Sequence, residues 1–251
     1  MDKLIYTAFN TLNNIYDNRS VRAQNMANVN VPGYRRDLGT RSVGSAFMTA
    51  ENTFQSRALS VRDDTNIFES DPGTLSQTGA DMDVALRSDG YFMVKGANAP
   101  SLTRRGDLSV DGEGFLVNGS SQKFLDKNQT PIKIGPYRAI KIADNGDIFV
   151  EPLGSEPGTR ELAATIGMTR AANEVLKKFP DGEIRTENGG LPVADQLPTL
   201  VQQHVELSNV NITEELVNTI EDQRSYEINI KLISSATEAD EAGAALMRMP
   251  G

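Results

Sequence analysis

Apolar residues at the N-terminal end of the chain recur at the spacing of an α-helix. They are separated by three and four residues, which places them on one side of a helix. These positions are Ile5, Ala8, Leu12 and Ile15, and the pattern resumes at Met26 after the polar positions Arg19 and Arg22. The pattern predicts a helix over residues 2–29, about 42 Å long at about 1.5 Å per residue.

A second helical pattern occupies residues 212–247 at the other end of the chain. Its apolar positions include Leu216, Ile220, Tyr226, Ile230 and Ile233. Polar residues interrupt both patterns, and such interruptions lower stability but select one register and one partner. A helix of this length would span about 54 Å, longer than most helices of globular proteins.

Neither predicted helix has neighbouring apolar sequence that could cover its apolar side. The two ends therefore pair with each other, contact another molecule, or form an antiparallel helical hairpin inside one ordinary domain. Asn25 and Asn28 lie near the end of the first helix, where their amides can cap carbonyls or bridge to a partner helix. The predicted assembly interface comprises Ile5, Ala8, Leu12, Ile15, Asn25, Met26, Asn28, Leu216, Ile220, Arg224, Tyr226, Ile230 and Ile233.

The sequence between the helices is rich in turn residues, a pattern typical of β-structure. Pro32 and Gly33 stop the first helix, and residues 39–67 follow as a long segment without clear period, extended or dependent on a partner. Further along, apolar runs alternate with Gly, Asn and Asp turns, as in residues 140–150. We predict an α+β protein in which long N- and C-terminal helices pair as a coiled-coil-like stalk beside a central antiparallel all-β domain. The predicted parts are an N-terminal assembly helix (1–35), an extended connector (36–75), the β domain (76–195) and a C-terminal assembly helix (196–251).

Composition narrows the functional classes. The 251 residues carry a formal net charge of -9, with 34 acidic and 25 basic residues, and contain neither a cysteine nor a basic run. Nucleic acid is therefore not an expected partner, and disulfides and thiolate metal sites are excluded. An apolar run of about 18 residues and a secretory signal are both missing, so we expect neither membrane insertion nor a cleaved signal peptide.

The sequence does not predict a catalytic, cofactor or metal site. Its single histidine, His204, has no cysteine to pair with. The acidic residues that could serve as paired catalytic carboxylates or calcium ligands sit in turn motifs, where backbone geometry demands them. They are Asp107, Asp111, Glu113, Asp144 and Asp147. The alternative from another class is a secreted carbohydrate-binding or carbohydrate-acting β protein with helical oligomerisation ends, and the lack of tryptophan weakens it.

Several motifs resemble those of the bacterial flagellar rod and hook family. Residues 23–35 read AQNMANVNVPGYR, close to the family signature A-x-N-L-A-N-x-x-T-P-G-F/Y-K/R, with Met26 in place of leucine and Val31 in place of threonine. Residues 207–210 read LSNV, and residues 220–229 fit the C-terminal pattern I-x-x-x-R-x-Y-E-x-N. Segments 83–86, 89–92, 103–106 and 111–114 resemble the central domain that the longer rod proteins share with the hook. The resemblance extends over nearly the whole chain.

This resemblance implies a structural subunit, not an enzyme. Family members build a tubular axial shaft that transmits torque and encloses the export channel. The implied partners are other rod subunits, in homotypic and heterotypic contacts, and the flagellar export apparatus. The implied location is the periplasm-spanning rod of the basal body, reached without a cleaved signal peptide. The opening residues and the length resemble the proximal-rod members, and a distal-rod or hook subunit is the alternative within the family.

Overall fold

A computed structural model describes residues 2–39, 42–49, 56–62 and 67–247, with side chains described within 7–39 and 67–246. The chain divides into two compact units. Unit 1 consists of Met1–Ala27, Asp37–Ile67 and Asn211–Gly251, and unit 2 consists of Asn28–Arg36 and Phe68–Val210. The helices of the described part are both in unit 1, and neither is apolar enough over its length to cross a membrane.

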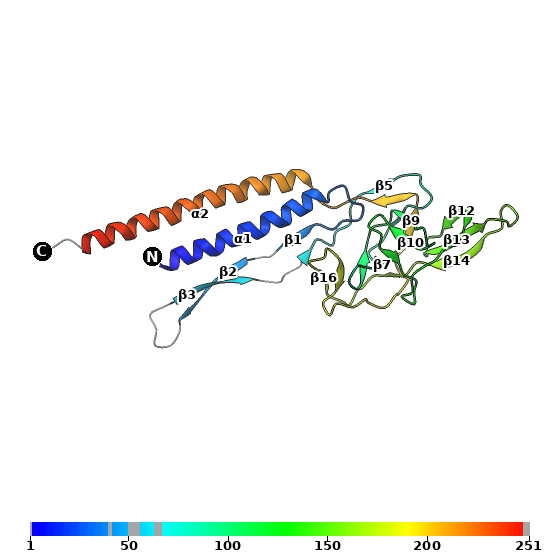
Figure 1. Cartoon of the computed structure of the whole chain (residues 1–251), viewed down its shortest axis with the longest axis horizontal. Helices are drawn as coiled ribbons and strands as arrows, with labels where there is room; N and C mark the ends of the chain where they lie inside the picture. Colours follow the sequence, from blue (N-terminus) through cyan, green and yellow to red (C-terminus); the bar gives the residue numbers. More distant parts are fainter. Residues whose placement is uncertain (1, 40–41, 50–55, 63–66, 248–251) are drawn as a thin grey trace. The chain divides into compact units, whose positions relative to one another are not determined.

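Unit 1 contains the two long helices and a β-hairpin. Helix α1 spans Asp2–Ala27 and helix α2 spans Ile212–Met247, which confirms both predicted helices and ends the first two residues early. The strands are β1 (Asp37–Gly39), β2 (Ser42–Thr49) and β3 (Ser56–Arg62), and β4 (Ile67–Phe68) begins at the last residue of this unit. Strands β2 and β3 pair antiparallel. Helix α1 contacts α2 on one side and the strands on another (Figure 1).

The prediction that the two helices pair as a coiled-coil-like stalk is wrong. A coiled coil buries a continuous apolar seam between its helices. The covered side of α2 instead repeats every seven residues through Glu215, Asp222, Asn229 and Ala236, of which Glu215 and Ala236 are buried and the others half-buried. The large apolar residues of α2 point in many directions and, apart from the half-buried Ile233, those with described side chains are exposed, so no continuous apolar seam lies between the helices. The fold is a two-helix unit with a hairpin, together with a large antiparallel β unit.

Unit 2 is built from short antiparallel strands. Its largest sheet has eight strands in the order β16-β17-β8-β7-β11-β10-β9, with β15 also paired to β7. A three-stranded sheet has the order β12-β13-β14, and β18-β6 and β19-β5 form two-stranded pairs. The strands are β5 (Leu75–Gln77), β6 (Val84–Leu86), β7 (Tyr91–Lys95), β8 (Pro100–Thr103), β9 (Leu108–Val110), β10 (Leu116–Asn118), β11 (Lys123–Phe124), β12 (Tyr137–Ile142), β13 (Asp147–Pro152), β14 (Glu161–Thr165), β15 (Met168–Thr169), β16 (Leu176–Lys178), β17 (Ile184–Thr186), β18 (Leu200–Gln202) and β19 (His204–Glu206).

The predicted strand–turn–strand motif near residue 145 is confirmed. Strands β12 and β13 pair with Ile142 opposite Ile148, and Gly146 in the turn has a φ of 88°. That left-handed conformation favours glycine, which explains the Asn-Gly turn in the sequence. The four predicted residue ranges of the domains remain a prediction. Residues 36–75, predicted as an extended connector, include β1 to β4 and the first residue of β5.

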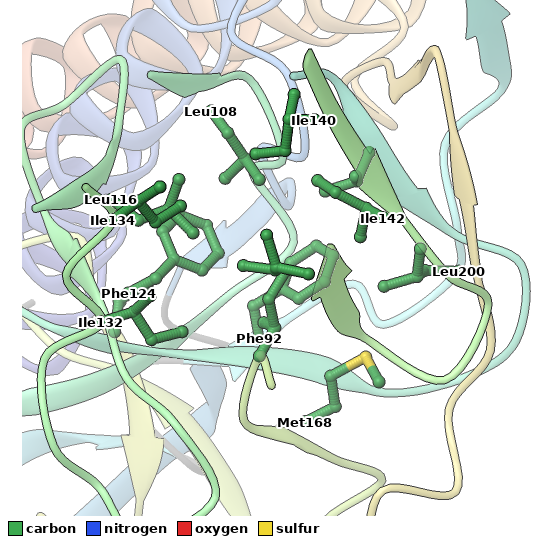
Figure 2. Close-up of a cluster of buried hydrophobic side chains, with 14 of the residues drawn as sticks. Phe92, Leu108, Leu116, Phe124, Ile132, Ile134, Ile140, Ile142, Met168 and Leu200 are labelled. Atoms are coloured by element: carbon green, nitrogen blue, oxygen red, sulfur yellow. The ribbon is translucent and has the colours of Figure 1, made fainter. Parts of the chain in front are cut away.

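The main hydrophobic core lies in unit 2. Side chains from the eight-stranded and three-stranded sheets meet there, among them Phe92, Phe124 and Ile148, all fully buried (Figure 2). The rings of Phe92 and Phe124 pack edge to face with centroids 5.7 Å apart. Such aromatic pairs add to the free energy gained from area burial alone. Unit 2 therefore has the packed hydrophobic core that an independently stable domain requires.

Candidate assembly surface

Helix α2 begins with an ordinary capping arrangement. The side-chain Oδ1 of Asn211 accepts hydrogen bonds from the backbone N–H groups of Thr213, at 3.0 Å, and Glu214, at 3.4 Å. These donors would otherwise lack partners in the first turn. Glu214 and Glu215 also place negative charge near the positive end of the helix dipole. The sequence thus fixes where α2 starts through local hydrogen bonds.

The contact between α1 and α2 is ionic near the start of α2. The guanidinium of Arg22 lies 2.7 Å from the carboxylate of Asp222 and 3.7 Å from that of Glu215. One turn earlier in α1, Arg19 donates a hydrogen bond to the side-chain oxygen of Gln223 at 3.0 Å. Lower residue numbers in α1 meet higher numbers in α2, so the helices run antiparallel. Arg19 and Arg22, which interrupt the apolar pattern of α1, are therefore the residues that attach it to α2.

Asn25 is buried and joins α1 to the strand that follows it. Its side-chain amide donates to the backbone oxygen of Asp37 at 2.8 Å, and its side-chain oxygen accepts from the Asp37 N–H at 2.9 Å. The same amide lies 3.4 Å from Glu215 Oε1. Asn25 thus bridges to α2 and holds β1 with two backbone hydrogen bonds. Asn28 is half-buried, and its backbone oxygen accepts from Val31 in the turn after the helix.

The predicted interface residues of α1 face the interior of unit 1. Ala8 and Ile15 are buried, and Leu12 and Met26 are half-buried. Ile5 belongs to the backbone of α1, but its side chain lies outside the described part of the structure. The apolar side of α1 identified from the sequence is therefore largely covered within the chain.

The predicted interface residues of α2 are mostly exposed. The exposed fractions of the four large apolar side chains are 50% for Leu216, 57% for Ile220, 40% for Tyr226 and 43% for Ile230. Arg224 is also exposed, whereas Ile233 is half-buried. Glu227 accepts a hydrogen bond from Gln223 at 3.0 Å. A long helix with this much exposed apolar surface is typical of a contact site for another molecule.

A buried charge cluster in unit 2 was not recognised from the sequence. The carboxylate of Glu206 lies 2.8 Å from Nη1 of Arg35 and 2.6 Å from Nε of Arg104, and all three side chains are buried. It also accepts a hydrogen bond from the Gly73 N–H at 2.9 Å. Burial lowers the pKa of Arg35 and raises the pKa of the neighbouring Tyr91. Both arginines lie in segments that resemble the family motifs, but no local pattern indicated their common partner.

The cluster joins two segments of unit 2 that adjoin unit 1 in the sequence. Besides the ion pair with Arg35, the Gly33 N–H donates to the backbone oxygen of Glu206 at 2.7 Å. Gly33 has a φ of 67°, and a Cβ at this position would lie 2.3 Å from the backbone carbon of Arg104. Only glycine fits there, which accounts for the Pro-Gly stop after the first helix. The segments 28–36 and 204–206 are thereby fastened together.

The acidic residues considered for catalysis have structural partners in turns. Asp111 accepts from the N–H groups of Glu113 and Phe115 at 2.9 and 2.8 Å, and Asp107 pairs with Arg105 at 2.7 Å. Asp147 accepts from the hydroxyl of Thr165. The half-buried His204 has its Nδ1 2.9 Å from the backbone oxygen of Gln202. Among the side chains that the structure describes, no cluster of three or more His, Asp and Glu is placed to hold a metal ion.

Comparison with known proteins identifies relatives over the whole chain. Residues 201–246 match a family described as flagellar basal body rod FlgEFG protein C-terminal. The chain is 28% identical to the flagellar basal-body rod protein FlgF of Salmonella typhimurium, over 99% of this chain and 100% of that protein. It is 29% identical to FlgF of Escherichia coli, over 98% and 97%. It is 32% identical to the rod protein FlgG of Buchnera aphidicola subsp. Baizongia pistaciae, over 88% and 90%.

Proposed function

Because the chain belongs to the family of flagellar basal-body rod proteins, we propose that it is a structural subunit that polymerises through its terminal helices into the rod. The observation that carries this proposal is the exposed apolar surface of α2. Burying one isoleucine or leucine contributes about 1.5–3 kcal/mol, so several such residues along one helix favour contact with neighbouring subunits. In the rod, the subunit would help to enclose the export channel and to transmit torque.

Within the rod, we propose a proximal position. The FlgF relatives from Salmonella typhimurium and Escherichia coli match this chain over 99% and 98% of its length and over 100% and 97% of their own. The resemblance of residues 1–8 to the N-terminal residues of proximal-rod proteins supports the same assignment. The proposed partners are other rod subunits, of its own and of related kinds, and the flagellar export apparatus. The proposed route to the periplasm-spanning rod is export without a cleaved signal peptide.

The direct test is to locate the chain in purified basal bodies. We expect mass spectrometry to find it there with its first residues intact, and we expect a strain that lacks the gene to stop building flagella before the distal rod. A variant with Ile220→Asp should be produced and exported but should be missing from basal bodies. A chain that is absent from basal bodies of the wild-type strain, or a gene deletion that leaves flagella complete, would contradict the proposal.

A further inference from the structure

We propose that Asn188 is a site of spontaneous chemical modification, at which the side-chain amide is lost and aspartate or isoaspartate forms. The inference is independent of the proposed function, because it depends on one exposed turn of unit 2. The chain has three Asn-Gly pairs, at residues 118–119, 145–146 and 188–189. The structure places the three pairs in different environments, and these environments separate Asn188 from the other two asparagines.

The reaction joins an asparagine side chain to the backbone nitrogen of the next residue. The nitrogen of Gly189 loses its proton to solvent and attacks the side-chain carbonyl carbon, Cγ, of Asn188. A C–N bond forms there, the bond from Cγ to the side-chain nitrogen breaks, and that nitrogen takes up a proton and leaves as ammonia. Water then opens the resulting cyclic succinimide at either of its carbonyls, which gives aspartate or isoaspartate. The net change is the gain of a water molecule and the loss of ammonia.

Glycine after the asparagine favours this attack. No side chain shields its nitrogen, and its backbone adopts conformations that other residues rarely reach. Two further conditions depend on the fold. The asparagine side chain must rotate until Cγ reaches the neighbouring nitrogen, and the turn must have space for the ring. Hydrogen bonds that hold the side chain in one rotamer oppose the first condition, and close packing against the glycine opposes the second.

The turn at Asn188 meets both conditions. Asn188 is exposed and, within the part of the chain that the structure describes, its side chain makes no hydrogen bond. A Cβ at Gly189 would meet no described atom within 4 Å, so the space beside the turn is open. The Gly189 N–H donates to the backbone oxygen of Thr186 at 2.7 Å. The attack therefore requires a local opening of this exposed turn, and a second glycine, Gly190, makes such an opening easier.

The turn at Asn145 is a matched comparison, because this asparagine is also exposed. The Gly146 N–H donates to the backbone oxygen of Ala143 at 2.9 Å, again to the residue three positions earlier. The Asn145 amide, however, donates to Oδ2 of Asp147 at 2.7 Å, and its oxygen accepts from the Asp147 N–H at 3.2 Å. Gly146 is buried, and a Cβ there would lie 2.9 Å from Cε of Met168. The fold therefore opposes both conditions at Asn145.

The turn at Asn118 is the most protected of the three. Asn118 is only 1% exposed, and its amide donates to the side-chain oxygen of Gln122 at 2.9 Å. Its own side-chain oxygen accepts from the N–H groups of Ser120 and Gln122, both at 3.0 Å. A Cβ at Gly119 would overlap the guanidinium of Arg105. Three pairs of identical residues are thus expected to react at different rates, with Asn188 the fastest.

The modification changes the backbone of the turn that follows β17. The Thr186 hydroxyl donates to the Gly190 oxygen at 3.1 Å, and the hydroxyl oxygen accepts from the Gly190 N–H at 3.2 Å. Isoaspartate at position 188 adds a methylene to the backbone between these residues and so disturbs both bonds. Leu191, directly after the turn, packs against a buried cluster that includes Ile184. Modification therefore loosens residues 187–191, and because the reaction needs only water, the modified fraction increases with the age of the molecule.

Peptide mass spectrometry of the full-length chain tests the proposal. The folded protein is incubated at mildly alkaline pH in heavy-oxygen water, which labels carboxylates formed during the incubation. The conversion of all three Asn-Gly peptides is then followed in the same sample. Incubation in concentrated urea gives the rates without the fold. Asn188→Gln is the control variant, because the extra methylene of glutamine disfavours the ring, and its peptide should keep its mass while Asn118 and Asn145 behave as in wild type.

In the folded chain, we expect Asn188 to convert several-fold faster than Asn145 and Asn118, with isoaspartate among the products. The three rates should become similar in urea, and hydrogen exchange of residues 187–191 should be faster in the modified chain. Equal rates at Asn188 and Asn145 in the folded protein would overturn the proposal. So would a difference that persists unchanged in urea, because the fold would then not be its cause, or a product that contains aspartate alone, because that excludes the succinimide.

Discussion

The two units of this chain bury their apolar residues to very different degrees. In unit 2, Phe92, Phe124 and Ile148 are fully buried among strands of two sheets. In α2 of unit 1, among the residues whose side chains are described, the buried ones are Glu215 and Ala236, while large apolar residues stay exposed. Helices without a packed apolar side are marginal in water. The comparison teaches that unit 2 contains its own source of stability, whereas unit 1 retains apolar surface for contacts with other molecules.

The largest loss in the free energy of unfolding should follow from a cavity in the core of unit 2. Phe124→Ala removes one ring of the aromatic pair, and such substitutions in cores cost about 3–5 kcal/mol. Chemical denaturation followed by circular dichroism should show this loss in the free energy of unfolding. The matched control is Phe9→Ala in α1, an exposed phenylalanine that should change it by less than about 0.5 kcal/mol. Similar losses of unfolding free energy in both variants would contradict the conclusion that the packed apolar core is confined to unit 2.

A slightly smaller effect is expected from the buried charge cluster. Glu206→Gln leaves Arg35 and Arg104 without their carboxylate, and breaking a buried ion pair costs about 3 kcal/mol or more. The exposed Glu113 carries the control substitution, Glu113→Gln, because its partner Lys123 lies at the surface and such pairs contribute less than about 1 kcal/mol. Thermal unfolding of both variants measures the difference. A wild-type melting temperature for Glu206→Gln would show that the cluster does not stabilise unit 2.

A smaller, pH-dependent effect is expected at Asp126. Burial alone would raise its pKa, but hydrogen bonds from Thr130 and Asn128 outweigh burial and leave the pKa below the ordinary value of 3.8. Because the native pKa is depressed, the carboxylate stabilises the fold above pH 3.8, and this contribution is lost as pH falls through the native pKa. Asp126→Asn should therefore lower the free energy of unfolding by about 1 kcal/mol at pH 7 and by progressively less below pH 4.

Denaturant titrations between pH 2 and 7 would measure the difference between wild type and Asp126→Asn. The exposed Asp89 provides the control, and Asp89→Asn should change stability little at any pH. A wild-type advantage that stays constant down to pH 2, or that grows on acidification, would contradict the depressed pKa as the cause.

The smallest effect on the isolated chain should come from the exposed surface of α2. Ile230→Asp should change the free energy of unfolding by less than about 0.5 kcal/mol, because a side chain that is 43% exposed loses little packing. Its incorporation into the rod should nevertheless be lost, since a charge would replace an apolar contact in every subunit. Ile230→Leu, which keeps the apolar side chain, should incorporate normally. A large loss of monomer stability in Ile230→Asp would show that this residue belongs to the core of unit 1.

The sequence predicted the elements of this protein better than their contacts. Hydrophobic periodicity located both helices, and the Asn-Gly turn located the hairpin of β12 and β13, because these features depend on neighbouring residues. The packed side of α2 could not be recognised, since apolar residues surround that helix and the contact with α1 depends on Arg22, Asp222 and other polar residues. Periodicity identifies an apolar side but cannot show whether the chain itself covers it.

Contacts between segments that are distant in the sequence could not be predicted from it either. Glu206 meets Arg35 and Arg104 across more than a hundred residues of intervening sequence. Each of the three residues reads as an ordinary surface charge when only its neighbours are considered. In the same way, the order of strands in the eight-stranded sheet follows from pairing that no local pattern encodes. Long-range partners of this kind require either the folded structure or comparison among many related sequences.

The position of Glu206 also determines how unit 2 keeps its first segment in place. The chain passes from α1 into unit 2 at residue 28 and from unit 2 to α2 at residue 211. The segments next to these two points are fastened together by Gly33, Arg35 and Glu206. In the sequence, residues 37–67 of unit 1 separate the segment 28–36 from the rest of unit 2, so these contacts attach it to β19 of that unit. Unit 2 therefore includes a stretch of chain that joins it through side-chain and backbone contacts and not through continuity of the sequence.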